Sequence, residues 1–114
     1  LGSGIDICYP ISNYELYNYI KVNGLLLSEY PPGVQPTPEK FPIRNRIIAG
    51  LSKCLLVVES SLKSGTMITA SMAMDCNREV LCVPSSKLNE SGANSCIKDG
   101  ATLVENSEDV NVFY

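Results

Sequence analysis

The sequence predicts an α/β protein with an open, mostly parallel sheet and flanking helices. Short apolar runs alternate along the chain with segments of helical periodicity, and this alternation is typical of strands joined by right-handed crossovers. The clearest run, Cys54–Glu59, is apolar up to its last residue, as expected of a buried parallel strand. The 114 residues suffice for one modest domain with one core.

The first third of the chain is expected to contain two short strands and one helix. Leu1–Gly4 looks like the end of a strand, and Leu25–Leu27 reads as a second one. Between them, Ile11–Val22 carries apolar and aromatic residues at helical spacing, and Asn23-Gly24 is a usual helix end. Residues 31–38 hold four prolines, which exclude a regular helix or a central strand. This segment is either a functional loop or a rigid connector.

A helix is expected after the proline-rich segment, with Pro42 in its first turn. Four apolar residues at helical intervals are expected to face the core: Ile43, Ile47, Ile48 and Leu51. The elements expected after the Cys54–Glu59 strand are a helix over Thr66–Cys76, a strand over Glu79–Val83, a helix over Asn94–Lys98 and a strand over Ala101–Val104.

Residues 1–104 are expected to form part of one domain, and residues 105–114 a tail that is mostly loop. Because the chain begins abruptly and without Met, we expect a fragment of a longer protein. No apolar run approaches the roughly 20 residues of a membrane helix, so no membrane association is expected. The five cysteines are odd in number and show no C-x-x-C spacing, which favours buried, reduced thiols in a cytoplasmic protein.

The net charge of −3 conceals a basic segment. Between Lys40 and Lys63 the chain has five basic residues and one acid, Glu59, giving +4 there and −7 elsewhere. A local patch determines where an anion binds more than the total charge does. The sequence has no histidine, which removes the commonest general base and zinc ligand. We therefore expect no catalytic residue, no metal site and no cofactor.

Arg44, Asn45 and Arg46 are the first candidate anion contacts. They are expected in the first turn of their helix, where exposed N–H groups make the helix end effectively positive. Cations are unfavourable there unless an anion comes to the site. The alternative is a solvated helix face that happens to be basic.

Lys63, Ser64, Gly65 and Thr66 are the second candidate group. They follow an apolar strand and open a helix, so backbone N–H groups, two hydroxyls and an ammonium group are available to a phosphate. The Walker pattern is absent, and Gly2-Ser3-Gly4 lacks the third glycine of a dinucleotide fingerprint. An ordinary capped helix start remains an equal alternative.

Three acids and two tyrosines also lie in the expected loops. Asp6, Glu29 and Glu59 follow or end expected strands; pairing with arginine or loop stabilisation is favoured over catalysis or ribose binding. Tyr9 and Tyr30 lie in the expected loops, from which aromatic rings can stack on nucleobases.

These segments together resemble the DNA-processing protein A family (DprA, also called Smf). The resemblance rests on the block Phe41–Ser52 (FPIRNRIIAGLS) and on several shorter motifs in matching order over residues 1–104: Gly4-Ile5-Asp6, Tyr9-Pro10, Leu27–Pro31, Ser64-Gly65-Thr66, Ile68-Thr69-Ala70, Arg78-Glu79-Val80, Val83-Pro84 and Asp99-Gly100-Ala101. It implies part of a Rossmann-like domain that binds single-stranded DNA, protects incoming DNA in natural transformation and helps to load the recombinase RecA. A homodimer is a further expectation.

The resemblance implies DNA or phosphate contact at Arg44, Asn45, Arg46, Ser64, Gly65 and Thr66, whereas Lys63 is assigned from its position. Two basic contacts of the family are missing: the Gly-Ser-Arg turn of the N-terminal half, and the basic residue after Tyr9-Pro10, where Ile11 stands. Pro84-Ser85 replaces the usual Pro-Gly. The alternative function is a nucleotide-binding enzyme similar to the lysine-decarboxylase-like phosphoribohydrolases. Thr69 occupies the position of their catalytic-type glutamate, which argues against hydrolysis.

Overall fold

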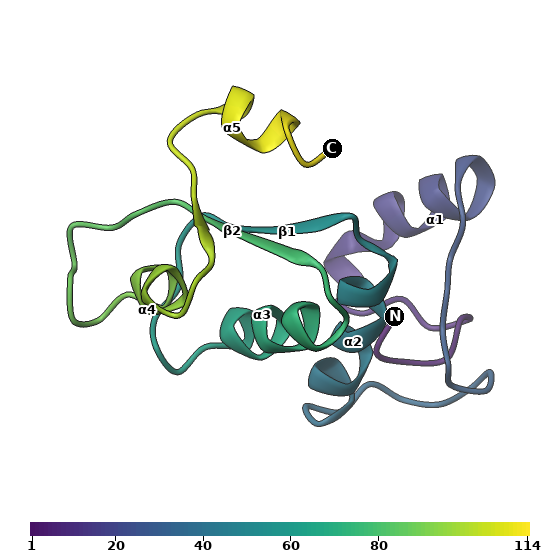
Figure 1. The fold of residues 1–114 in the computed structure, drawn as a ribbon. Helices are drawn as coiled ribbons and strands as arrows, with labels where there is room; N and C mark the ends of the chain where they lie inside the picture. Colours follow the sequence, from purple (N-terminus) through teal and green to yellow (C-terminus); the bar gives the residue numbers. More distant parts are fainter. The chain divides into compact units, whose positions relative to one another are not determined.

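The computed structural model describes residues 1–114, and the chain divides into two compact units. The first unit comprises Leu1–Arg44 and the second Asn45–Tyr114. Figure 1 shows the course of the chain through both units. None of the helices is both long enough and apolar enough to span a lipid bilayer.

The second unit contains a parallel sheet of three strands in the order β1-β2-β3. These strands are β1 (Cys54–Val57), β2 (Glu79–Cys82) and β3 (Thr102–Leu103). Val57 pairs with Cys82, and Cys82 in turn pairs with Leu103, so all three strands end at one edge. The parallel α/β class predicted from the apolar runs is therefore confirmed.

Helices α3 (Gly65–Asp75) and α4 (Gly92–Lys98) connect the strands and pack on one face of the sheet (Figure 1). The core under them is built from small residues and strand side chains: Ala49, Val57, Ala70, Ala73, Val80, Cys82, Ala93 and Cys96. Alanines on the helices let their backbones approach the sheet closely. Burial raises the pKa of the Cys82 thiol from 9.0 to about 12, so this core thiol stays protonated.

All five cysteines are free thiols, as expected, but they are not all buried. Cys82 and Cys96 are buried in the core, Cys8 and Cys54 are half-buried, and Cys76 is exposed. Cys76 lies outside the core because it caps the C-terminus of α3 at the surface.

Helix α2 (Lys40–Leu51) starts in the first unit and ends in the second. Pro42 lies in its first turn, as predicted. The expected core face is wrong in part: Ala49 is the buried residue of α2, whereas Ile43, Ile48 and Leu51 are exposed. Helical spacing identifies an apolar stripe, but burial requires a neighbouring element to cover that stripe.

The first unit contains a short 3₁₀ turn (Ile11–Asn13) and helix α1 (Tyr14–Asn23). The two together match the predicted helix, and Gly24 ends α1 by donating its N–H to the carbonyl of Ile20 at 2.8 Å. No residue of α1 is buried.

The two strands expected in the first unit are not formed. The amino group of Leu1 donates to the Leu27 carbonyl at 2.7 Å, and the Ser28 hydroxyl donates to the Ser3 carbonyl at 2.6 Å. These contacts hold the two segments together, but a strand also needs a ladder of backbone hydrogen bonds. The prediction of two strands from these apolar runs is therefore wrong.

The proline-rich segment is irregular, as predicted, and turns at Gly33 with a φ of 86°. Val34 donates its N–H to the Pro31 carbonyl at 3.3 Å, which closes the turn. Asp6 accepts the Gly33 N–H at 2.9 Å. This contact confirms the loop-stabilising role favoured for Asp6.

The tail is more regular than expected, because α5 (Ser107–Asn111) occupies half of it. Asn106 accepts the N–H groups of Glu108 and Asp109, and the Asp109 carboxylate accepts the Asn106 N–H in return. This reciprocal capping box specifies the helix start in a segment without an apolar run.

Candidate nucleic-acid interface

Residues 58–62 connect β1 to the turn Lys63–Thr66, and α3 begins within this turn. Ser64 is the N-cap residue, with an extended backbone, but its side chain makes no capping hydrogen bond. The first N–H groups of a helix have no partner within the helix, and a capping oxygen usually accepts one of them. At α3 the Met67 N–H donates to the Ser64 carbonyl at 3.1 Å, whereas no side chain caps the N–H groups of Gly65 and Thr66, which stay available to an anion.

The Ser64 hydroxyl gives this turn a second unusual property. Its oxygen is buried and has no hydrogen-bond partner. Leaving a buried polar group unpaired costs about 1–3 kcal/mol. Rotation of the Ser64 side chain towards the start of α3 would let a phosphate oxygen accept this hydroxyl and offset that cost, so the turn has a feature of an anion site that an ordinary helix start lacks.

Gly65 is not required by packing within the protein. A Cβ placed on it would meet no other atom within 4 Å. Lys63 and Thr66 are exposed beside it. Open space over the first helical N–H groups, flanked by an ammonium group and a hydroxyl, is suited to close approach of a phosphate.

Arg44, Asn45 and Arg46 lie in the second turn of α2, because the helix starts at Lys40. The expected first-turn position is therefore wrong, and the helix dipole acts weakly there because its effect falls off within the first turn. Arg44 is half-buried, with its guanidinium 5.5 Å from the ring centre of Phe41, whereas Arg46 is exposed. All three residues take part in interactions within the protein.

Residues two apart on a helix point in different directions, so Arg44 and Arg46 present their charges on different sides of α2. Arg44 belongs to the first unit, and Asn45 and Arg46 belong to the second. The arginines form two separate cationic points along α2.

Tyr9 and Phe41 form an aromatic pair in the first unit, with ring centres 5.8 Å apart. Tyr9 is 58% exposed, so more than half of this residue is accessible to solvent. Tyr30 is half-buried, and the Lys40 ammonium lies 5.7 Å from its ring centre. The sequence identified Tyr9 and Tyr30 as candidate stacking residues but did not single out Phe41. The available signal for Phe41 was an aromatic residue directly before Pro42.

The contacts of the three candidate acids lie within the protein. Asp6 holds the Gly33 turn, as described above. For Glu59, pairing with an arginine or loop stabilisation is the favoured expectation, and the structure places its carboxylate 4.0 Å from the Lys87 ammonium. Glu29 also interacts within the chain. No group of three or more His, Cys, Asp or Glu side chains is arranged to hold a metal ion.

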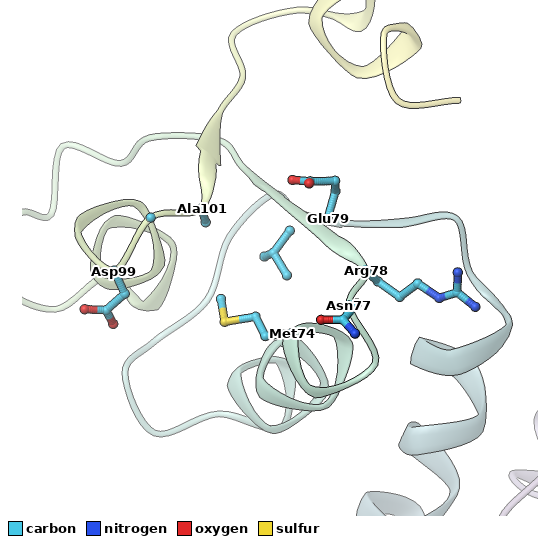
Figure 2. A pocket seen from close by; sticks show the side chains of 8 residues that line it. Met74, Asn77, Arg78, Glu79, Asp99 and Ala101 are labelled. Atoms are coloured by element: carbon cyan, nitrogen blue, oxygen red, sulfur yellow. The ribbon is translucent and has the colours of Figure 1, made fainter.

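The amino end of the sheet carries a different pocket, with a volume of about 330 Å³ (Figure 2). Its lining includes two acids, Glu79 and Asp99. Arg78 also lines the pocket, but its guanidinium extends away from the other lining side chains and donates to the Gly50 carbonyl at 2.7 Å. Acids without a cation directed inward disfavour a phosphate, so the carboxyl edge remains the candidate interface.

A three-stranded parallel sheet whose strands are joined by helices, with a helix start at its carboxyl edge, defines a Rossmann-like α/β protein. The family model for DNA recombination-mediator protein A matches residues 1–114. The chain belongs to this family.

Curated relatives agree with this assignment. DNA processing protein DprA of Streptococcus pneumoniae is 44% identical over 112 residues, which are 96% of this chain and 40% of the relative. Protein Smf of Synechocystis is 46% identical over 106 residues, 91% of this chain and 27% of the relative. The chain therefore spans less than half the length of these relatives.

Solved structures show the same fold. The crystal structure of DprA from Streptococcus pneumoniae superposes with a TM-score of 0.88 at 43% identity, over 97% of this chain and 40% of that one. DprA from Helicobacter pylori, described for its single-stranded DNA binding mode, superposes with a TM-score of 0.85 at 32% identity, over 97% of this chain and 53% of that one.

Proposed function

We propose that this chain is a single-stranded DNA-binding module of a DNA-processing protein. The observation that carries the proposal is the turn at the start of α3, where the buried Ser64 hydroxyl has no partner and the first helical N–H groups are uncapped. DNA phosphates would accept hydrogen bonds from this turn and pair with Lys63. Arg44, Asn45 and Arg46 supply further contacts along α2.

The aromatic pair of Tyr9 and Phe41 supports a single strand as the ligand. Unpaired bases expose both ring faces, and stacking on an aromatic side chain contributes about 1–3 kcal/mol per base. Tyr9 is exposed, and the Arg44 guanidinium lies over the ring of Phe41, so stacking and phosphate contact are available within the first unit. The bases of a duplex are stacked on each other and cannot use this pair.

The proposal includes no catalytic step. Thr69, at the position of the catalytic-type glutamate of phosphoribohydrolases, donates its hydroxyl to the Gly65 carbonyl at 3.2 Å. A hydroxyl held by its own helix cannot replace a carboxylate as a general base. DprA from Helicobacter pylori is described for its single-stranded DNA binding mode, which supports binding rather than nucleotide hydrolysis.

The wider role belongs to the same proposal. We place this module in a cytoplasmic protein that protects incoming single strands during natural transformation and recombination, with a RecA-type recombinase as partner and a homodimer as its assembly. The shared family supports this role. Because the chain covers only part of each relative, the affinity of the module alone is expected to be modest.

Fluorescence anisotropy with a labelled oligothymidine and with a duplex of equal length tests the function. We expect the single strand to bind more tightly, and Arg44→Ala or Arg46→Ala to weaken binding and to flatten the dependence of log Kd on log salt concentration. Lys98→Ala, at the C-terminus of α4, is the matched control. Unchanged binding and unchanged salt dependence in both arginine variants would contradict a role of α2 in DNA binding. Equal affinity for both DNA forms would contradict the preference for single strands. Circular dichroism verifies that each variant is folded.

A further inference from the structure

One cation at the carboxyl edge of the sheet lies outside the residues assigned so far. Lys87 is in the loop Ser85–Glu90, which follows β2. Because β1 and β2 are parallel and end in register, this loop leaves the sheet at the same edge as the segment that leads to the Ser64 turn (Figure 1). The sequence signal for it is a lysine shortly after a buried strand, β2, which ends before Pro84.

The backbone ties this loop to the segment before Ser64. Ser61 and Ser91 form an isolated antiparallel bridge. Leu62 donates its N–H to the Glu90 carbonyl at 3.2 Å, and Gly92 donates to the Ser60 carbonyl at 2.9 Å. The approach is so close that a Cβ on Gly92 would collide with side-chain atoms of Ser60 and Met67. The two segments therefore hold a defined relative position.

Both ends of the loop are also anchored on the start of α4. The Asn94 side-chain oxygen accepts the Ser85 N–H at 2.9 Å, and the side-chain nitrogen donates to the Ser85 carbonyl at 2.7 Å. At the other end, the Ser91 hydroxyl accepts the Asn94 N–H at 3.2 Å. A short loop anchored at both ends places Lys87 with little freedom of its backbone.

The Lys87 side chain is available to a ligand. Its ammonium lies 4.0 Å from the Glu59 carboxylate, and the two side chains are 69% and 79% exposed. An ion pair this exposed contributes little to stability, so a phosphate can replace Glu59 as the partner of Lys87 at small cost. Glu59 directly follows the apolar run of β1 and precedes Ser60, so the pair lies beside the segment that leads into the Ser64 turn.

We propose that Lys87 is a further phosphate contact for the bound strand and that Glu59 opposes this contact. This inference rests on the single-stranded DNA binding proposed above. The ligand group is a backbone phosphate next to the one held at Ser64. Glu59 competes for Lys87 and repels the incoming phosphate, so it lowers the affinity that the cation would otherwise give.

The test measures the affinity of this chain for oligothymidine over a series of salt concentrations. Lys87→Ala is expected to raise Kd by about threefold to tenfold and to reduce the salt slope by about 0.7, the value for one phosphate contact on a single strand. Glu59→Gln is expected to lower Kd, because it removes the competing charge and keeps the side-chain shape. Lys98→Ala, the same charge change on α4, is expected to leave both quantities unchanged.

The outcomes separate this inference from the function on which it rests. If the unmodified chain binds oligothymidine and Arg46→Ala weakens it, but Lys87→Ala leaves Kd and slope unchanged, Lys87 is not a contact and only this inference is wrong. An equal effect of Lys98→Ala would indicate a general charge effect and would also overturn it. If the unmodified chain binds no single strand, the proposed function fails, and the assignment of Lys87 fails with it.

Discussion

Replacing Gly65 by alanine distinguishes between an anion site and an ordinary helix start at the beginning of α3. Gly65 is the first residue of α3, and a Cβ there would meet no protein atom within 4 Å. The substitution therefore adds a methyl group only to the space in which a phosphate is proposed to lie. Stability and affinity for single-stranded DNA are expected to change in opposite directions.

The expected magnitudes follow from this geometry. Glycine is about 1 kcal/mol less favourable than alanine inside a helix, so Gly65→Ala is expected to raise the free energy of unfolding by up to about 1 kcal/mol. The methyl group keeps a phosphate away from the first N–H groups of α3. Loss of one hydrogen bond to a charged group costs about 1.5–3 kcal/mol, which corresponds to at least about a tenfold increase in Kd.

Urea unfolding followed by circular dichroism measures the first change, and anisotropy with labelled oligothymidine measures the second. Ser95→Ala is the matched control, because Ser95 lies inside α4, outside the pocket that Ser64 and Gly65 line, and alanine also improves helix propensity there. It is expected to stabilise the chain and to leave Kd unchanged. A Gly65→Ala variant that is more stable and binds as tightly as the unmodified chain would refute phosphate binding at this turn.

Two further predictions concern the structure itself. Gly33→Ala is expected to lower the free energy of unfolding by about 1–2 kcal/mol in urea titrations, because alanine is strained at a φ of 86° although a Cβ has open space there; no change would show that the turn relaxes. The pKa of the Cys82 thiol is raised from 9.0 to about 12 in the folded state, so the thiol ionises more readily in the unfolded chain than in the folded one. The free energy of unfolding therefore falls as pH rises from about 9 towards about 12. Between about pH 8 and pH 10 the unmodified chain should lose about 1 kcal/mol more than Cys82→Ala in urea titrations, and equal losses would contradict the shift.

Local sequence patterns predicted the strands and helices of the second unit well, because there each predicted strand has a neighbouring strand with which it pairs. The runs at Cys54 and Glu79 pair with each other in register, and α3 covers them within one residue of the predicted range. In the first unit the same kind of pattern did not lead to strands. Leu25–Leu27 is as apolar as β1, but strand formation depends on a hydrogen-bonded neighbour, which a run of residues does not specify.

The candidate site was predictable where it depends on a single segment. The Ser64 turn needs only a strand, a helix start and a glycine, and all three can be recognised from the sequence. The pairing of Glu59 with Lys87 was not predictable, because it depends on the bridge between Ser61 and Ser91, thirty residues apart along the chain. The unpartnered state of the Ser64 hydroxyl was equally hidden, since it depends on what surrounds the oxygen.

The structure also changes why Arg44 and Arg46 matter. Their expected conflict with the helix dipole disappears, because α2 starts at Lys40 and both residues lie beyond its first turn. The start of α3 favours anion binding instead, because its N-cap side chain makes no capping hydrogen bond and a buried hydroxyl there has no partner. The arginines then act as added cations on α2, and such contacts contribute to affinity mainly through release of counterions from DNA. It follows that losing an arginine should alter the salt dependence of binding, whereas blocking the Ser64 turn with Gly65→Ala should weaken binding at every salt concentration.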